Sequence, residues 1–222
     1  KSLRSVAAFC MQSKADAERI IAMGAPRDRV EVTGTMKFDL VAPASARPAR
    51  EIEAQLGLSS GAKLIVAGST HPGEEEALLD AYLRLRDGRD DLRLLIAPRH
   101  VDRVADIERT VRGRGLEPVR VSGLGQARAA DGGRVLIVDK IGILGDIYAA
   151  ATVVFVGGSL VRHGGQNPIE PALYGKPVIF GPHMFNFKAV AAALLEKGGA
   201  VRVDDEGALE RECARLLDDP AA

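Results

Sequence analysis

The feature that most restricts the fold of this chain is an alternation of short apolar runs with amphipathic segments, which starts at residue 63. The apolar runs occupy residues 63–68, 92–98, 117–123, 134–139, 153–158, 177–182 and 200–203. Short runs that are apolar at consecutive positions indicate strands buried on both faces. Segments with helical periodicity separate most of them, so the sequence predicts an α/β fold with a Rossmann-like parallel sheet and helices on both faces.

The first 40 residues differ from this pattern. Ser13 is placed to cap a helix that runs to Met23, with Asp16 three residues on and Gly24 as the stop signal. Residues 37–50 are rich in Ala, Pro and Ser and lack a sustained apolar period, which is typical of a linker. We therefore expect a domain boundary near Leu40, and the start of the chain within an apparent strand indicates a fragment of something longer.

Charge and cysteine content limit the kinds of binding partner and bound metal that this chain is expected to have. Lys plus Arg and Asp plus Glu both total 30, and no dense basic tract occurs, which argues against a nucleic-acid partner. Cys10 and Cys213 lie far apart and read as ordinary thiols of a reducing compartment, not as a disulfide or metal site. No apolar run approaches the roughly 20 residues of a membrane span, and no signal peptide is recognisable, so we expect a soluble chain that binds a small molecule or another protein.

Ligands of parallel α/β sheets bind at the carboxyl ends of the strands, so the loops that follow the strands are the candidate site. These loops are residues 67–75, 97–100, 139–146, 157–171 and 180–187, and they contain all four histidines and most of the glycines. Ser69 and Thr70 can present hydroxyl and N–H groups to a phosphate, or they can simply cap the helix that Glu74 begins.

Two further loops allow a binding interpretation beside a structural one. Arg99, followed by His100, can hold a phosphate with two hydrogen bonds, or it can be a surface arginine paired with a carboxylate. Gly142, Ile143 and Leu144 can form an apolar cradle for a flat base, although a core-facing Ile and Leu explain the same residues.

The loop at residues 157–171 is the most specific signal. Gly157 and Gly158 end a strand and let a ligand approach the backbone, and Ser159 adds a hydroxyl. Asn167 can cap the next helix, Pro168 suits its first position, and Glu170 lies in its first turn, where a carboxylate accepts two hydroxyls well. A capping Asn and a dipole-favoured Glu are the structural alternative, which does not require the preceding glycines.

The segment GGSLVRHGGQNPIEPALYGKPVIFGPHMFNF resembles the nucleotide-sugar-binding motif of the 3-deoxy-D-manno-octulosonic acid (Kdo) transferases. The resemblance extends to GSTHPGEEE, APRH and TGTMKFD, and so covers nearly the whole chain. One residue departs from the pattern: Gln166 stands where the family usually has His before the Asn. Glutamine donates a hydrogen bond but does not titrate, which puts an acid role for this position in doubt.

This resemblance implies an inverting, metal-independent glycosyltransferase of the two-domain GT-B fold, with no cofactor. Such an enzyme transfers Kdo from CMP-Kdo to a lipid A precursor in Gram-negative lipopolysaccharide synthesis, at the cytoplasmic face of the inner membrane. Residues 41–222 would form its C-terminal, donor-binding domain, and residues 1–40 the trailing segment of the N-terminal domain with the interdomain linker. The catalytic base and most of the acceptor and membrane contacts would belong to the missing N-terminal domain, so we expect no transfer by this chain alone.

The resemblance also assigns roles to individual residues. Ser69, Thr70 and Arg99 correspond to phosphate or sugar contacts, and Gly142, Ile143 and Leu144 to the cytosine cradle. Glu170 corresponds to the acceptor of the ribose hydroxyls. The phosphate end would be lined by Gly158, Ser159 and Asn167, with His100 and Lys140 as further candidates.

Other functions share parts of this pattern. A GT-B glycosyltransferase or epimerase that uses a UDP-sugar would keep the alternation and the Glu at the helix start, but it should prefer UDP to CMP. A non-catalytic nucleotide-binding module would keep the loops without needing a partner domain. A scaffold domain would need an exposed apolar patch, which the convergent polar loops do not favour.

Overall fold

A computed structural model of the chain describes residues 2–34, 47–126 and 133–219. The chain divides into two compact units, Lys1–Ala42 and Pro43–Ala222, which are treated separately below. The boundary expected near Leu40 and most of the expected linker fall within residues 35–46, outside the described residues.

The first unit is a small βαβ element. Strand β1 (Phe9–Met11) pairs in parallel with β2 (Val30–Val32), and helix α1 (Lys14–Ala22) connects them. The capping prediction is confirmed, because the Ser13 side chain accepts the N–H of Asp16. The short 3-10 turns η1 (Ser2–Ser5) and η2 (Arg27–Arg29) complete this unit.

The second unit is built on a seven-stranded sheet in the order β5-β6-β4-β3-β7-β8-β9, and every neighbouring pair is parallel. The strands are β3 (Lys63–Thr70), β4 (Leu92–Pro98), β5 (Glu117–Arg120), β6 (Arg134–Ile137), β7 (Val153–Val156), β8 (Val178–Phe180) and β9 (Ala200–Arg202). All seven lie on the apolar runs, so the prediction of a Rossmann-like parallel sheet is confirmed.

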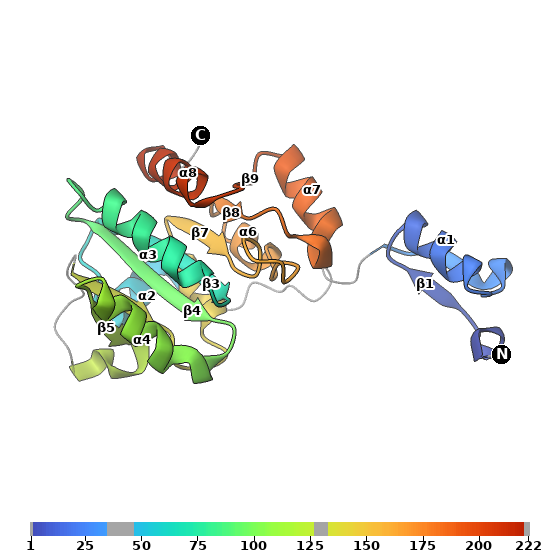
Figure 1. The fold of residues 1–222 in the computed structure, drawn as a ribbon, viewed down its shortest axis with the longest axis horizontal. Helices are drawn as coiled ribbons and strands as arrows, with labels where there is room; N and C mark the ends of the chain where they lie inside the picture. Colours follow the sequence, from blue (N-terminus) through green and yellow to red (C-terminus); the bar gives the residue numbers. More distant parts are fainter. Residues whose placement is uncertain (1, 35–46, 127–132, 220–222) are drawn as a thin grey trace. The chain divides into compact units, whose positions relative to one another are not determined.

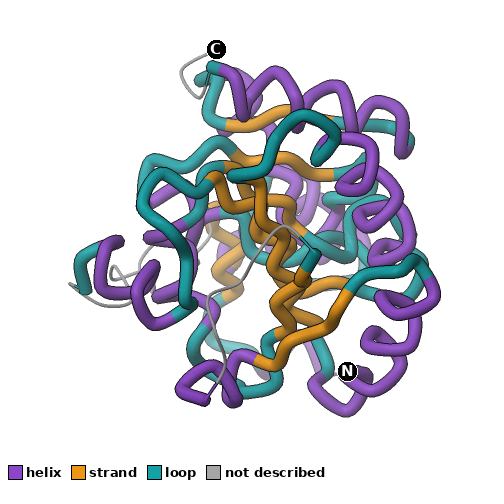
Figure 2. The backbone as a smooth tube through the Cα atoms, turned by 90° about the vertical axis from the view of Figure 1, so that its left-hand side faces the viewer, coloured by secondary structure: helices purple, strands orange, loops and turns teal. Residues whose placement is uncertain are grey.

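Helices cover both faces of this sheet (Figures 1 and 2). They are α2 (Ala49–Gln55), α3 (Glu74–Leu85), α4 (Val104–Gly113), α5 (Leu144–Ile147), α6 (Ile169–Leu173), α7 (Lys188–Glu196) and α8 (Glu206–Asp218). The 3-10 turns are η4 (Val101–Arg103), η5 (Val121–Gln126), η6 (Tyr148–Ala150) and η7 (Phe185–Phe187). Helix α2 is not predicted by the sequence, because its first residues end the Pro-rich stretch read as a linker. None of the helices in the described parts of the chain is long and apolar enough to cross a lipid bilayer.

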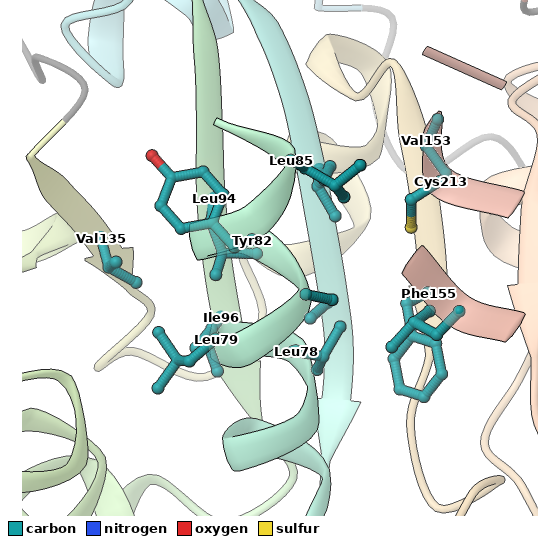
Figure 3. Packing of buried hydrophobic residues seen from close by; sticks show 14 of the residues in the cluster. Leu78, Leu79, Tyr82, Leu85, Leu94, Ile96, Val135, Val153, Phe155 and Cys213 are labelled. Carbon is teal, nitrogen blue, oxygen red and sulfur yellow. The ribbon is translucent and has the colours of Figure 1, made fainter. Parts of the chain in front are cut away.

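Alternate residues of the central strands enter two different cores. Ile65 and Ala67 of β3 pack with the cluster beneath α3, α4 and α8, whereas Leu64 and Val66 pack with the cluster beneath α2, η6 and α7. Figure 3 shows the first cluster, in which Leu79 and its neighbours on α3 face the central strands. Burial on both faces explains why the runs are apolar at consecutive positions.

The strand order places a switch point beside β3. The chain continues from β3 to its neighbour β4 on one side, and it returns later to add β7 on the other side. The helices that follow β3 and β7, α3 and α6, pack on opposite faces of the sheet, and open α/β sheets bind ligands at the carboxyl edge beside such a switch point.

We expect Leu79→Ala to lower the free energy of unfolding by about 3 kcal/mol, because Leu79 is fully buried and the substitution leaves a cavity. Leu195→Ala is the matched control, since Leu195 also lies on a helix but is 40% exposed and should lose well under about 1 kcal/mol. Urea unfolding followed by circular dichroism measures both. Equal losses would show that the first core does not stabilise the unit.

Candidate functional site

The loops after β3 and β7 meet at the carboxyl edge through direct backbone contact. The Gly157 N–H donates to the Gly68 carbonyl at 2.8 Å. A Cβ atom on Gly157 would lie 2.3 Å from the Ser69 carbonyl oxygen, so only glycine fits there. Ser69 itself has a φ of 56°, in the left-handed region that non-glycine residues seldom adopt. The sequence predicts close approach of a ligand at these glycines, but at Gly157 the approaching group is the chain itself.

Gly164 and Gly165, further along this loop, also pack closely against the protein itself. A Cβ on Gly164 would lie 2.3 Å from Asn186 Nδ2, and one on Gly165 would lie 2.2 Å from Met184 Sδ. Both residues also have positive φ angles, 109° and 76°. They let the loop at residues 180–187 pack against the loop at residues 157–171, so these glycines join two site loops to each other.

Glu74, at the first position of α3, binds both strand ends. Its carboxylate accepts N–H groups from His71 at 2.9 Å, Gly158 at 2.7 Å, Ser159 at 2.9 Å and Leu160 at 3.0 Å. The side chain is fully buried, and burial raises the pKa of Glu74 above its usual range, while the four N–H groups act in the opposite direction. The amides that the sequence assigns to a ligand are thus held by an internal carboxylate, which sequence analysis identifies only as a helix-start residue.

The hydroxyls of Thr70 and Ser159 are also used internally. Thr70 Oγ1 donates to Glu75 at 2.7 Å, and Glu75 is held in turn by both terminal nitrogens of Arg103. Ser159 Oγ donates to the Val156 carbonyl and accepts the Gly181 N–H. Both residues are 0% exposed and present no surface to a ligand, so the direct contacts expected of these two hydroxyls are not supported. They fix the backbone of the site instead.

A histidine cluster lies over these strand ends. The ring of His71 stacks on His163 with centroids 3.8 Å apart, and His100 meets it edge-on at 6.2 Å. Gln166 Nε2 lies 3.1 Å from His71 Nε2. Burial, together with the neighbouring His163, His100, Arg103 and Arg99, lowers the pKa of His71 from 6.5 to about 4. The sequence places these histidines in site loops but does not predict that they form a cluster.

Arg99 and His100 are both exposed at the end of β4. The Arg99 backbone N–H donates to the Thr70 carbonyl at 3.0 Å, which ties this loop to the end of β3. Its guanidinium forms no ion pair with any carboxylate of the described residues. The surface ion pair considered as the alternative is therefore absent there, and the charge is available to an anion.

The loop at residues 139–146 presents a different apolar residue from those expected. Ile143 and Leu144 are partly buried and pack against the second core cluster, which agrees with the structural alternative. Ile141 is 87% exposed, and Gly142 beside it is exposed with a φ of 89°. Ile141 thus offers more apolar surface to a flat base than Ile143 or Leu144. Lys140 is exposed in the same loop.

Asn167 and Glu170 form one unit. Asn167 Oδ1 accepts the Ile169 N–H at 3.1 Å, and its Nδ2 donates to Glu170 Oε1 at 3.0 Å. Helix α6 begins at Ile169 with Pro168 as the preceding cap residue, one position later than the sequence predicts. Glu170 is half-buried and forms no ion pair among the described residues, so its second oxygen is available to a ligand.

The sequence of this chain is similar to those of known 3-deoxy-D-manno-octulosonic acid transferases. Residues 1–40 match the family model described as 3-deoxy-D-manno-octulosonic-acid transferase (kdotransferase). The chain is 32% identical to the 3-deoxy-D-manno-octulosonic acid transferase of Haemophilus influenzae, over 96% of this chain and 49% of that protein. It is 36% identical to a bifunctional glycosyltransferase/methyltransferase of Fusobacterium nucleatum, over 91% of this chain and 31% of that protein. The chain thus spans about half or less of the length of these curated relatives.

Solved structures with a similar fold include a nucleotide-sugar-binding domain and an epimerase. The crystal structure of the C-terminal CMP-Kdo binding domain of WaaA from Acinetobacter baumannii is similar, with a TM-score of 0.70 and 27% identity over 78% of this chain and 89% of that one. A UDP-N-acetylglucosamine 2-epimerase has a TM-score of 0.57 at 15% identity, over 97% of this chain and 50% of that one, which shows a shared fold only. The predicted GT-B half is confirmed by these neighbours.

We expect Glu74→Gln to lower the free energy of unfolding by about 1–3 kcal/mol, because an amide NH₂ would face backbone N–H donors that need an acceptor. Glu76→Gln is the control, since Glu76 lies on the same helical turn but is exposed. Hydrogen exchange should quicken at residues 158–160 in the first variant alone. Unchanged exchange there would contradict the role given to Glu74.

The lowered pKa of His71 predicts a pH dependence. The unfolded chain takes up this proton near pH 6.5 and the folded chain only near pH 4, so His71 loses stabilising effect as the pH falls through this window. As the pH decreases, the free energy of unfolding of the unmodified chain should decrease relative to that of His71→Gln, by up to about 1.4 kcal/mol per pH unit. Urea titrations between pH 4 and pH 7 (roughly the window in which His titrates) measure this difference. His100→Gln, which removes an exposed ring, should keep most of the slope, and a flat difference for His71→Gln would refute the assignment.

Proposed function

Since this chain belongs to the Kdo transferase family, whose members it matches along more than nine-tenths of its length, we propose that it contains their donor-binding domain and binds CMP-Kdo. The observation that carries the proposal is the likeness to a CMP-Kdo binding domain, which includes 27% identity over 89% of that domain. In this proposal residues 41–222 bind the donor, and residues 1–40 end the preceding domain and lead into the linker.

The charges of the carboxyl edge agree with a nucleoside monophosphate sugar. Arg99 is exposed and unpaired with the described carboxylates, so it is the residue for the donor phosphate. Glu170, which Asn167 holds by one oxygen, accepts ribose hydroxyls with the other. Gly142 gives the base access to the backbone of the loop at residues 139–146, and Ile141 adds apolar contact.

In this proposal, several residues of the site do not touch the donor but hold the backbone that surrounds it. Thr70 and Ser159 fix the ends of β3 and β7, and Gly158 is fixed by the carboxylate of Glu74. Ser69 is partly exposed beside them and keeps its proposed contact with the phosphate or sugar. His100, exposed in the histidine cluster, lies next to Arg99 and adds a hydrogen-bond donor.

The parent enzyme, in this proposal, transfers Kdo to a lipid A precursor at the cytoplasmic face of the inner membrane in lipopolysaccharide synthesis. The acceptor hydroxyl loses its proton to a base of the N-terminal domain and attacks the anomeric carbon of Kdo with inversion. The bond from that carbon to the phosphate oxygen breaks, and CMP leaves with the electron pair. Positive charge at Arg99 stabilises the developing phosphate charge, as charged donors do when they are fixed in advance.

Isothermal titration of the chain with CMP and with UMP tests the donor assignment. We expect CMP to bind more tightly than UMP, and Glu170→Ala to lose at least about tenfold in affinity, because a hydrogen bond to a charged group is removed. Glu196→Ala is the control, since it removes an exposed carboxylate at the end of α7. A preference for UMP would reject the CMP assignment in favour of a UDP-sugar enzyme, and binding unaffected by Glu170→Ala would reject the role of that carboxylate.

A further inference from the structure

Tyr148, the first residue of η6, is a buried aromatic residue that the sequence motifs do not single out. It is 3% exposed, and its ring belongs to the second core cluster, together with Val66 and Val156 of the central strands. Its side chain points towards the carboxyl edge of the sheet, and its hydroxyl lies against Gly68. A Cβ atom on Gly68 would be 2.2 Å from Tyr148 Oη. The hydroxyl therefore lies at the end of β3, one residue before Ser69.

The hydroxyl of Tyr148 has no hydrogen-bond partner among the described residues, whereas that of Tyr82, in the other core, donates to the Leu92 carbonyl at 3.3 Å. Among the described residues, only Tyr174 Oη is a side-chain oxygen that is both fully enclosed and without a hydrogen-bond partner. Because Tyr148 Oη also lacks a partner but is not of this kind, it keeps some surface open to solvent. A buried polar group that lacks an internal partner is costly unless something else supplies the bond.

Glu170 lies on α6, which contacts η6, and its carboxylate determines which kind of group can be the partner of the phenol. Burial raises the pKa of Tyr148, and the nearby carboxylate of Glu170 raises it further, so the phenol stays protonated and is a hydrogen-bond donor. A phosphate placed against Glu170 would be repelled. A neutral hydroxyl satisfies both neighbours, because its oxygen accepts from the phenol while its proton is donated to the carboxylate.

We propose that Tyr148 is a further ligand contact of the donor site, whose hydroxyl donates to a ribose hydroxyl that itself donates to Glu170. This inference rests on the proposed function, because it takes the ligand to be a ribonucleotide. Tyr148 and Glu170 then read the ribose from two elements, η6 and α6, and together they select a ribonucleotide over a deoxyribonucleotide. Gly68 is required because any side chain there would displace the phenol.

Tyr148→Phe tests this role, since it removes the hydroxyl and keeps the ring. We expect the affinity for CMP to fall about threefold to tenfold, as for one hydrogen bond. The loss should disappear when the same titration uses 2′-deoxy-CMP or 3′-deoxy-CMP, whichever lacks the hydroxyl that Tyr148 contacts. The midpoint of thermal unfolding without ligand should not fall, because no internal bond is broken.

Tyr82→Phe is the matched control, because it removes a buried phenol that does have an internal partner. It should lower the unfolding midpoint and leave CMP affinity unchanged, which is the opposite result. Unchanged CMP affinity in Tyr148→Phe would overturn the inference, and so would an equal loss with CMP and both deoxy analogues. A fall in the unfolding midpoint as large as that of Tyr82→Phe would show a structural role instead.

These outcomes separate the inference from the function on which it rests. If the unmodified chain prefers UMP, the CMP-Kdo assignment fails, and the Tyr148→Phe titration is repeated with UMP and its deoxy analogues. If the chain prefers CMP and Tyr148→Phe binds it normally, the function stands and the inference fails. Absence of binding of either nucleotide to the unmodified chain would count against both.

Discussion

The carboxyl edge of this sheet depends on a single buried carboxylate. Glu74 lies at the start of α3 and accepts N–H groups from its own loop and from the loop after β7, so one side chain joins the two strands that flank the switch point. Removing a carboxylate from water is costly, and four N–H groups offset this cost only when all are correctly placed. The positions of Gly158, Ser159 and Leu160 are therefore set before any ligand arrives.

Much of the fold could be predicted from the sequence because it depends on local pattern. Consecutive apolar residues identify the strands, and Ser13 marks the start of α1 through a bond within its own turn. Helix α2 could not be predicted, because Pro48 precedes it and only burial of Ile52 and Leu56 against the sheet makes it a helix of the core. Its stability comes from distant residues, which a local pattern does not contain.

The sequence indicates the edge of the sheet at which the candidate site lies but not the contacts within it, for the same reason. Strand ends and glycine-rich loops give the edge at which polar residues gather. Whether a hydroxyl faces a ligand or the protein depends on partners far away in sequence, as with Ser159 and Gly181 or Gly68 and Tyr148. The glycines of residues 157–165 indicate tight backbone approach correctly, but they do not say which group approaches. The histidine cluster likewise joins positions almost a hundred residues apart.

The hydrogen bonds of Glu74 also determine which changes of loop length and sequence the domain can tolerate. An insertion or deletion within residues 158–160 would move three of the four N–H donors away from the buried Glu74 carboxylate and leave it only the His71 N–H, so a change of length there would be destabilising. The loop at residues 139–146 is not packed in this way at its tip, since nothing lies within 4 Å of a Cβ atom added at Gly142, where only the positive φ of 89° favours glycine. The two loops therefore tolerate different changes: new side chains have room around the exposed residues 140–142, whereas the hydrogen bonds to Glu74 fix the length of the loop after β7.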